Sequence, residues 1–160
     1  MKWNARDATV FFNEKEYIDT VCIPLVPIAF EGDGKTAANE SEFIDLVTRA
    51  IEKQFKGRIL LLPPFIYFRS SEEELSRLFD YWENYIENGY FKHIIFITSN
   101  PFWQKVINGN YKVIWLPSIP LEHLDESTKL RVINNQAEQV IDHIIHHWQE
   151  VERHNNLQKK

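Results

Sequence analysis

Apolar runs alternate with amphipathic stretches along this chain of 160 residues. Three of the runs lack polar alternation, which is the pattern of strands covered on both faces of a parallel sheet. They are residues 19–30, 57–68 and 93–98, and a fourth strand is predicted at 111–117. The pattern therefore predicts a sheet of about four strands, most of them parallel.

Prolines interrupt two of these predicted strands. Pro24 and Pro27 lie in the first, and Pro63 and Pro64 break the second. Because proline has no backbone N–H to donate, we expect regular pairing to weaken or stop at these positions on at least one side of the strand.

Apolar residues at helical spacing predict the segments between the strands. The expected helices are residues 4–16, 39–55, 71–88, 101–107 and a long one from about 125 to 153. Cap signals support them: Asn4 with Asp7, Ser71 with Glu74, and Asn100 before a proline. Gly109 is expected to end the short fourth helix. At the start of the chain, Trp3, Val10 and Phe11 are predicted to pack inward.

Alternating strands and helices indicate βαβ units with helices on both faces of the sheet. We expect one domain over residues 1–153, a three-layer α/β/α sandwich, and a frayed polar tail at 154–160.

Composition narrows the class of protein. A hydrophobic content of 44% excludes a disordered chain, and no apolar run reaches the roughly 20 residues of a membrane-spanning helix. A net charge of −5 without a basic run argues against nucleic-acid partners and anionic membranes. Cys22 is the only cysteine, lies in an apolar run and is predicted to be a core residue; we expect a cytoplasmic protein without membrane insertion.

Ligands of open parallel sheets bind outside the carboxyl ends of the strands. The polar residues predicted at that edge are Glu31, Asp33, Tyr67, Arg69, Thr98, Ser99, Asn100 and Ser118. The candidate ligand-binding residues are Glu31, Asp33, Lys35, Tyr67, Arg69, Ser99 and Asn100.

Residues 29–36, AFEGDGKT, match the relaxed form of a phosphate-binding loop. In that chemistry Lys35 would bind the outer phosphate oxygens and Thr36 would bind Mg²⁺. The helical pattern resumes only near Asn39, whereas the lysine of such a loop stands at a helix start. We therefore predict a solvated turn, with nucleotide binding as a lower alternative.

Histidines follow one stripe of the last helix, since His143, His147, Glu150 and His154 are spaced by four, three and four residues. Two histidines one turn apart can chelate a metal. We favour a polar flank beside the buried face, keep His143 and His147 as weak metal candidates, and expect no cofactor.

The chain resembles the YpiF-like proteins of Bacillus-type bacteria. The resemblance lies in Trp3 with Asp7, the segments KEYIDTVCIPLVP and EKQFKGRILLLPP, and the strand VIWLP. It covers essentially the whole chain and implies no particular activity.

A second resemblance is to the front of creatininase-type amidohydrolases. The resemblance lies in three segments: the first predicted strand, which contains two prolines and leads to Glu31, and the segments PPFIYFRSSEE and GYFKHIIFITSN. Asp33 stands where that family has a histidine, and the later histidine ligands are missing. The resemblance thus implies a creatininase-like or Rossmann-like fold without histidine ligands for a metal pair.

These observations predict a non-catalytic binding or regulatory protein whose partner is a small molecule or a protein, and which can form homo-oligomers. The alternative is a hydrolase that uses the carboxylates of Glu31 and Asp33, with Glu42, around Mg²⁺ or Mn²⁺.

Overall fold

The computed structural model describes residues 1–69, 72–86, 88–107 and 111–160. Five strands form one sheet, and every strand pair in it is parallel. The strands are β1 (Thr20–Ile28), β2 (Ile59–Leu61), β3 (Phe65–Phe68), β4 (His93–Thr98) and β5 (Tyr111–Trp115). They lie in the order β2-β1-β4-β5, and β3 also pairs with β1, so β1 is central.

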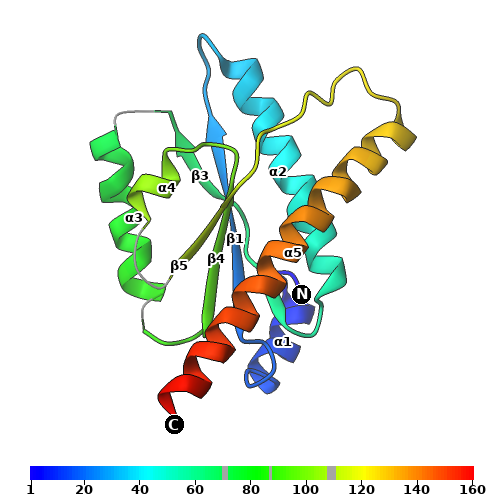
Figure 1. Cartoon of the computed structure of the whole chain (residues 1–160). Coiled ribbons are helices and arrows are strands. Elements are labelled where there is room, and N and C mark those ends of the chain that lie inside the picture. The colour runs from blue at the N-terminus through cyan, green and yellow to red at the C-terminus, as the bar shows by residue number, and fades with distance from the viewer. Residues whose placement is uncertain (70–71, 87, 108–110) are drawn as a thin grey trace.

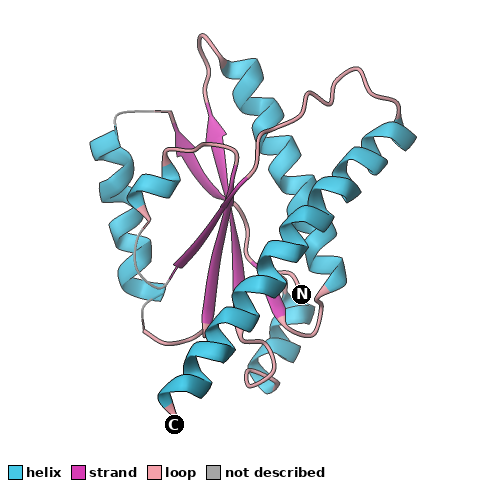
Figure 2. Cartoon of the chain, viewed as in Figure 1, coloured by secondary structure: helices cyan, strands magenta, loops and turns pink. Residues whose placement is uncertain are grey.

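Helices cover both faces of this sheet, which confirms the three-layer α/β sandwich (Figures 1 and 2). They are α1 (Ala5–Asn13), α2 (Gly34–Gln54), α3 (Glu72–Ile86), α4 (Trp103–Val106) and α5 (Glu126–Gln158). Helices α2 and α5 lie on one face, and α3 and α4 lie on the other (Figure 1).

The prolines divide the pairing of β1 as predicted. Its first residues pair with β2 from Thr20 to Cys22, and its last ones pair with β3 from Leu25 to Ile28. Pairing with β4 on the other side ends at Pro24. The chain between β2 and β3 contains Pro63 and Pro64, so one predicted strand is in fact two short ones.

Each face of the sheet has its own apolar cluster. On the α2 and α5 side it includes Phe43, Ile95 and Trp148, and on the α3 and α4 side it includes Phe79 and Trp103. The buried apolar side chains of β1 and β4 thus belong to one cluster or the other according to the face of the sheet on which they lie.

In the first helix the expected cap is present, because the Asn4 side chain accepts a hydrogen bond from the Asp7 amide at 2.9 Å. Phe11 is buried as predicted. The prediction was wrong for Trp3 and Val10, which are 50% and 37% exposed. Trp3 precedes α1, and Val10 lies one position, about 100° around the helix, from the buried Phe11.

The start of α2 corrects a second prediction, because the helix begins at Gly34 and not at Asn39. The loop after β1 turns through Gly32, which has a φ of 58°. A side chain at Gly34 would bring its Cβ within 2.6 Å of the carbonyl oxygen of Ala29. The tight return of the backbone therefore starts the helix early, in residues too polar to show an apolar stripe.

A third prediction was wrong at the end of α5. The helix continues to Gln158, so residues 154–158 are helical and are not a frayed tail. Its predicted start is confirmed by Asp125, whose side chain accepts a hydrogen bond from the Thr128 amide at 2.7 Å. Ser71 and Gly109, expected at a cap and a helix end, lie outside the described residues.

Candidate functional site

A pocket of about 320 Å³ opens at the carboxyl edge of the sheet, where the sequence predicts a site. Its walls come from the ends of β3 and β4, the second turn of α2, the start of α4 and helix α3. The lining residues are Glu40, Tyr67, Arg69, Leu75, Ser99, Asn100, Pro101 and Phe102.

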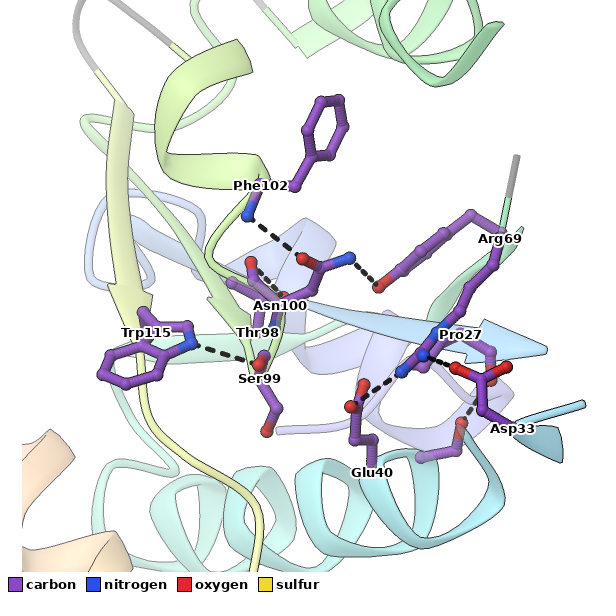
Figure 3. A network of polar contacts seen from close by, with 11 residues as sticks. Pro27, Asp33, Glu40, Arg69, Thr98, Ser99, Asn100, Phe102 and Trp115 are labelled. Carbon is purple, nitrogen blue, oxygen red and sulfur yellow. Dashed lines mark hydrogen bonds and ion pairs between the residues drawn. The ribbon is translucent and has the colours of Figure 1, made fainter. Parts of the chain in front are cut away.

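Arg69 follows β3 directly and holds two carboxylates (Figure 3). One of its terminal nitrogens pairs with Asp33 in the loop after β1. The other donates to Glu40 Oε1 of α2 at 2.8 Å. Through these two ion pairs, Arg69 connects the loop after β1, helix α2 and the end of β3.

Glu40 presents a second carboxylate oxygen, Oε2, that is buried and has no hydrogen-bond partner among the described residues. The residue is only 9% exposed, and its burial raises the pKa of the carboxyl group. A buried acceptor without a donor is costly, and such groups in a pocket wall are natural contacts for a ligand.

Asn100 organises the loop after β4 through hydrogen bonds of its backbone and its side chain (Figure 3). Its backbone N–H donates to Thr98 Oγ1 at 3.0 Å, and its Oδ1 accepts from the Phe102 amide at 3.1 Å. Its Nδ2 donates to the hydroxyl oxygen of Tyr67 at 3.2 Å. Burial, with a smaller contribution from the charge of Glu40, raises the pKa of Tyr67, so the phenol is neutral.

Ser99 supplies a second buried oxygen, because its Oγ has no hydrogen-bond partner in the described part of the chain. Its backbone is fixed all the same, since its carbonyl oxygen accepts from the indole N–H of Trp115 at 3.0 Å. A rigid backbone with an unsatisfied hydroxyl leaves that hydroxyl available to a bound molecule.

Of the predicted ligand-binding residues, the structure brings Tyr67, Arg69, Ser99 and Asn100 together in the pocket wall. Asp33 joins them through Arg69. Lys35 lies outside the pocket lining, and its ammonium group pairs with Glu122 at 2.7 Å. Glu31 is exposed, and neither it nor Ser118 lines the pocket.

Sequence reasoning missed Glu40, which the structure makes central. Glu40 precedes Phe43, Ile44 and Val47 by three, four and seven residues, so it lies on the buried stripe of α2. A carboxylate on a buried stripe was the signal that could have identified it.

The metal candidates lie apart. Glu42 is exposed and pairs with Lys129 at 2.8 Å, and Asp33 pairs with Arg69. No group of three or more histidine, cysteine, aspartate or glutamate side chains that could hold a metal ion occurs among the described residues. The carboxylate hydrolase stays a prediction, because none of these contacts supports it.

The residues of the phosphate-loop motif lie closer to a helix start than the sequence predicts. Because α2 begins at Gly34, both Lys35 and Thr36 lie in its first turn. The objection that the helix starts too late for such a loop was therefore wrong.

The opposite edge of the sheet has a second, polar cavity of about 540 Å³ under the C-terminal half of α5. Asp19 accepts from Arg58 Nε at 3.0 Å, from Arg58 Nη2 at 3.3 Å and from Thr20 Oγ1 at 2.8 Å. The guanidinium carbon of Arg58 lies 3.8 Å from the ring centroid of Trp148. The indole N–H of Trp148 in turn donates to Thr20 Oγ1 at 3.0 Å.

His147 meets a histidine that the sequence did not suggest, since its ring lies 5.2 Å from that of His93, centroid to centroid. Burial lowers the pKa of both side chains, so both are neutral near pH 7. His143, the other predicted metal candidate on this stripe, is exposed.

Comparison with known proteins places the chain in context. Residues 9–148 match the family model described as "Protein of unknown function (DUF2487)". The chain is 34% identical over 148 residues to "Uncharacterized protein YpiF" of Bacillus subtilis (strain 168), covering 92% of this chain and 98% of that protein. No solved structure gave a significant match, so the creatininase-like scaffold remains a prediction.

Within the described ranges, no helix combines the length and the apolar character that crossing a membrane requires.

Proposed function

Since the chain belongs to the DUF2487 family, whose function is unknown, we propose a function from its own site: it is a non-catalytic protein that binds a small polar molecule. The binding site in this proposal is the pocket at the carboxyl edge of the sheet. Binding there would order the loops after β1, β3 and β4 together, which is how such a protein could act as a regulator.

One observation carries the proposal. Two buried oxygens of the pocket residues, Glu40 Oε2 and Ser99 Oγ, have no hydrogen-bond partner in the described part of the chain. Leaving such a group unsatisfied costs about 1–3 kcal/mol, which a ligand with matching polar groups would recover on binding. The pocket volume of about 320 Å³ is at the lower end of the range of small-molecule sites.

The surroundings of Ser99 favour binding over covalent catalysis. A serine nucleophile is normally activated by an adjacent base. The described pocket lining holds no histidine, and its single carboxylate, Glu40, already accepts a hydrogen bond from Arg69. The groups of this pocket are thus better suited to hold a molecule than to react with it.

A thermal-shift screen of polar metabolites tests the proposal, because a ligand of the native state raises its melting temperature. We expect at least one compound whose effect is lost in Ser99→Ala and kept in Ser118→Ala. Ser118 is the matched control, since it is another partly buried serine that follows a strand but does not line the pocket. The proposal fails if every stabilising compound acts equally on both variants.

A second candidate is nucleotide binding at residues 29–36, favoured by the position of Lys35 and Thr36 in the first turn of α2. The ion pair of Lys35 with Glu122 would have to open for its ammonium group to reach a phosphate. ATP with Mg²⁺ should then raise the melting temperature, and Lys35→Ala should abolish the increase. An absence of stabilisation by ATP would remove this candidate.

A further inference from the structure

The charges around Arg69 do not balance. One guanidinium group faces two carboxylates, those of Asp33 and Glu40, so this cluster has a net charge of −1 when both acids are ionised. The two carboxylates already occupy both terminal nitrogens of Arg69. An anionic ligand that used the remaining N–H groups of Arg69 would lie beside these two carboxylates, whose negative charges repel it.

The unsatisfied end of this cluster belongs to a pocket residue. Glu40 is 91% buried, lines the pocket, and leaves Oε2 without a donor in the described part of the chain. Figure 3 shows its side chain rising from α2 toward Arg69. What this oxygen lacks is an N–H or O–H group with, for preference, a positive charge.

Two aromatic residues, Tyr67 and Phe102, line the same pocket. Aromatic faces attract ammonium and guanidinium groups through the quadrupole of the ring, and the attraction grows when water is excluded. A buried carboxylate oxygen and aromatic rings together are suited to an organic cation.

We propose that the ligand of this pocket carries a protonated amine or guanidinium group that donates to Glu40 Oε2. This inference rests on the proposed function and names its ligand class. A hydroxyl or carbonyl elsewhere on the ligand pairs with Ser99 Oγ, which can both donate and accept.

Three probes of similar size test the charge: benzylamine, benzyl alcohol and benzoate. Their binding is followed by titration in two-dimensional NMR, through the backbone amide signals of Ser99 and Asn100. We expect benzylamine to bind about tenfold or more tightly than the alcohol, because a charge-assisted hydrogen bond is about twice as strong as a neutral one. Benzoate should be the weakest of the three.

Glu40→Gln sharpens the test, because the amide oxygen can still accept from Arg69 while the NH₂ group replaces the free acceptor. We expect it to weaken benzylamine about tenfold and to leave benzyl alcohol unchanged. Asp45→Asn is the matched control, since Asp45 lies on the same helix, pairs with Arg49 and has a side chain that is 40% exposed. It should change none of the three affinities.

The outcomes separate the two proposals. Equal binding of the three probes, binding of none of them, or no effect of Glu40→Gln would overturn the cation class. The pocket itself would still stand if a compound from the metabolite screen lost its effect in Ser99→Ala. Failure of that screen together with unshifted Ser99 and Asn100 signals would overturn both.

Discussion

Arg58 and Arg69 stand at opposite edges of one sheet, and they are held in different ways. Arg58 donates twice to a single carboxylate, Asp19, and its guanidinium group lies on the ring of Trp148. Arg69 is shared by two carboxylates, Asp33 and Glu40, and each of the two arginines lines a cavity. The first cluster is charge-balanced, and the second has one negative charge in excess.

This difference indicates that Arg58 stabilises the fold, whereas the cluster of Arg69 is suited to bind a ligand. At the amino edge, hydrogen bonds close a path from Asp19 through Thr20 to Trp148, which ties β1 to α5. At the carboxyl edge, the cluster ends in an acceptor that nothing among the described residues satisfies. We therefore expect substitutions at the amino edge to cost stability, and those at the carboxyl edge to cost mainly ligand binding.

The largest effect is expected for Trp148→Ala, which removes the side chain that joins α5 to the amino edge. Trp148 is 8% exposed and also packs edge-on against Phe55, with ring centroids 5.1 Å apart. Truncation of a buried aromatic residue costs about 3–5 kcal/mol. Urea denaturation measures the loss, and Trp148→Phe, which keeps a ring but not the N–H donor to Thr20, should lose clearly less. Equal losses would show that the ring is not what anchors the helix.

A matched pair of substitutions compares the two arginines directly. Asp19→Asn removes the charge facing Arg58, and we expect a loss of about 1–3 kcal/mol, as for hydrogen bonds to charged groups in partly buried sites. Asp33→Asn should change stability by no more than about 0.5 kcal/mol, because Asp33 is 50% exposed and Glu40 continues to hold Arg69. Similar losses for the two variants in urea titrations would contradict the distinction.

Tyr67→Phe examines the carboxyl edge with the smallest change of shape. It removes the oxygen that accepts from Asn100 Nδ2, which should cost about 0.5–1.5 kcal/mol. Because Asn100 keeps its bonds to Thr98 and Phe102, the loop should retain its fold. Unchanged backbone amide signals after β4, together with the small stability loss, would support this; a rearranged loop would contradict it.

The weakest effect is a dependence of stability on pH with opposite signs at the two edges. Burial lowers the pKa of His93 and His147, so below the ordinary pKa of about 6.5 the unfolded chain binds protons first and stability falls. Burial raises the pKa of Glu40, so on acidification the native state binds that proton first, which opposes the loss.

Melting temperatures at pH 7.5 and 4.5 should therefore show a loss on acidification that shrinks in His147→Gln and grows in Glu40→Gln. Asp19 contributes outside this interval: burial would raise its pKa, but hydrogen bonds from Arg58 and Thr20 outweigh burial and lower it. Its share is lost only below the ordinary pKa of about 4. Identical pH profiles for the two variants and the parent protein would refute the assignment.

Much of the fold follows from the sequence because its strongest signals are local. Apolar runs identify the strands of the central sheet, and Pro63 and Pro64 mark the break in one of them. The first turn of α2 escaped detection because residues 34–38 lack an apolar stripe. That turn follows a tight return of the backbone toward Ala29, five residues earlier, which leaves no room for a side chain at Gly34.

The site could be predicted only in part. The rule that ligands bind at the carboxyl edge identified Tyr67, Arg69, Ser99 and Asn100, because each follows or ends a strand. The amino-edge cluster could not be foreseen, since Asp19 and Arg58 are 39 residues apart and Thr20 and Trp148 are 128 apart. Such contacts depend on how the helices and strands pack against one another, and no local sequence pattern predicts that packing.

The change of neighbours along β1 also has a consequence for hydrogen exchange. Beyond Pro24 the strand loses β4, and within the described part of the chain residues 25–28 pair with the four residues of β3 alone. This end of the sheet should open in a local fluctuation of lower free energy than the end where β2, β1 and β4 pair side by side. A ligand across the loops after β3 and β4 would slow the exchange of the amides of residues 65–68 and leave those of 93–97 unchanged, so occupancy of the pocket would be recorded in the sheet itself.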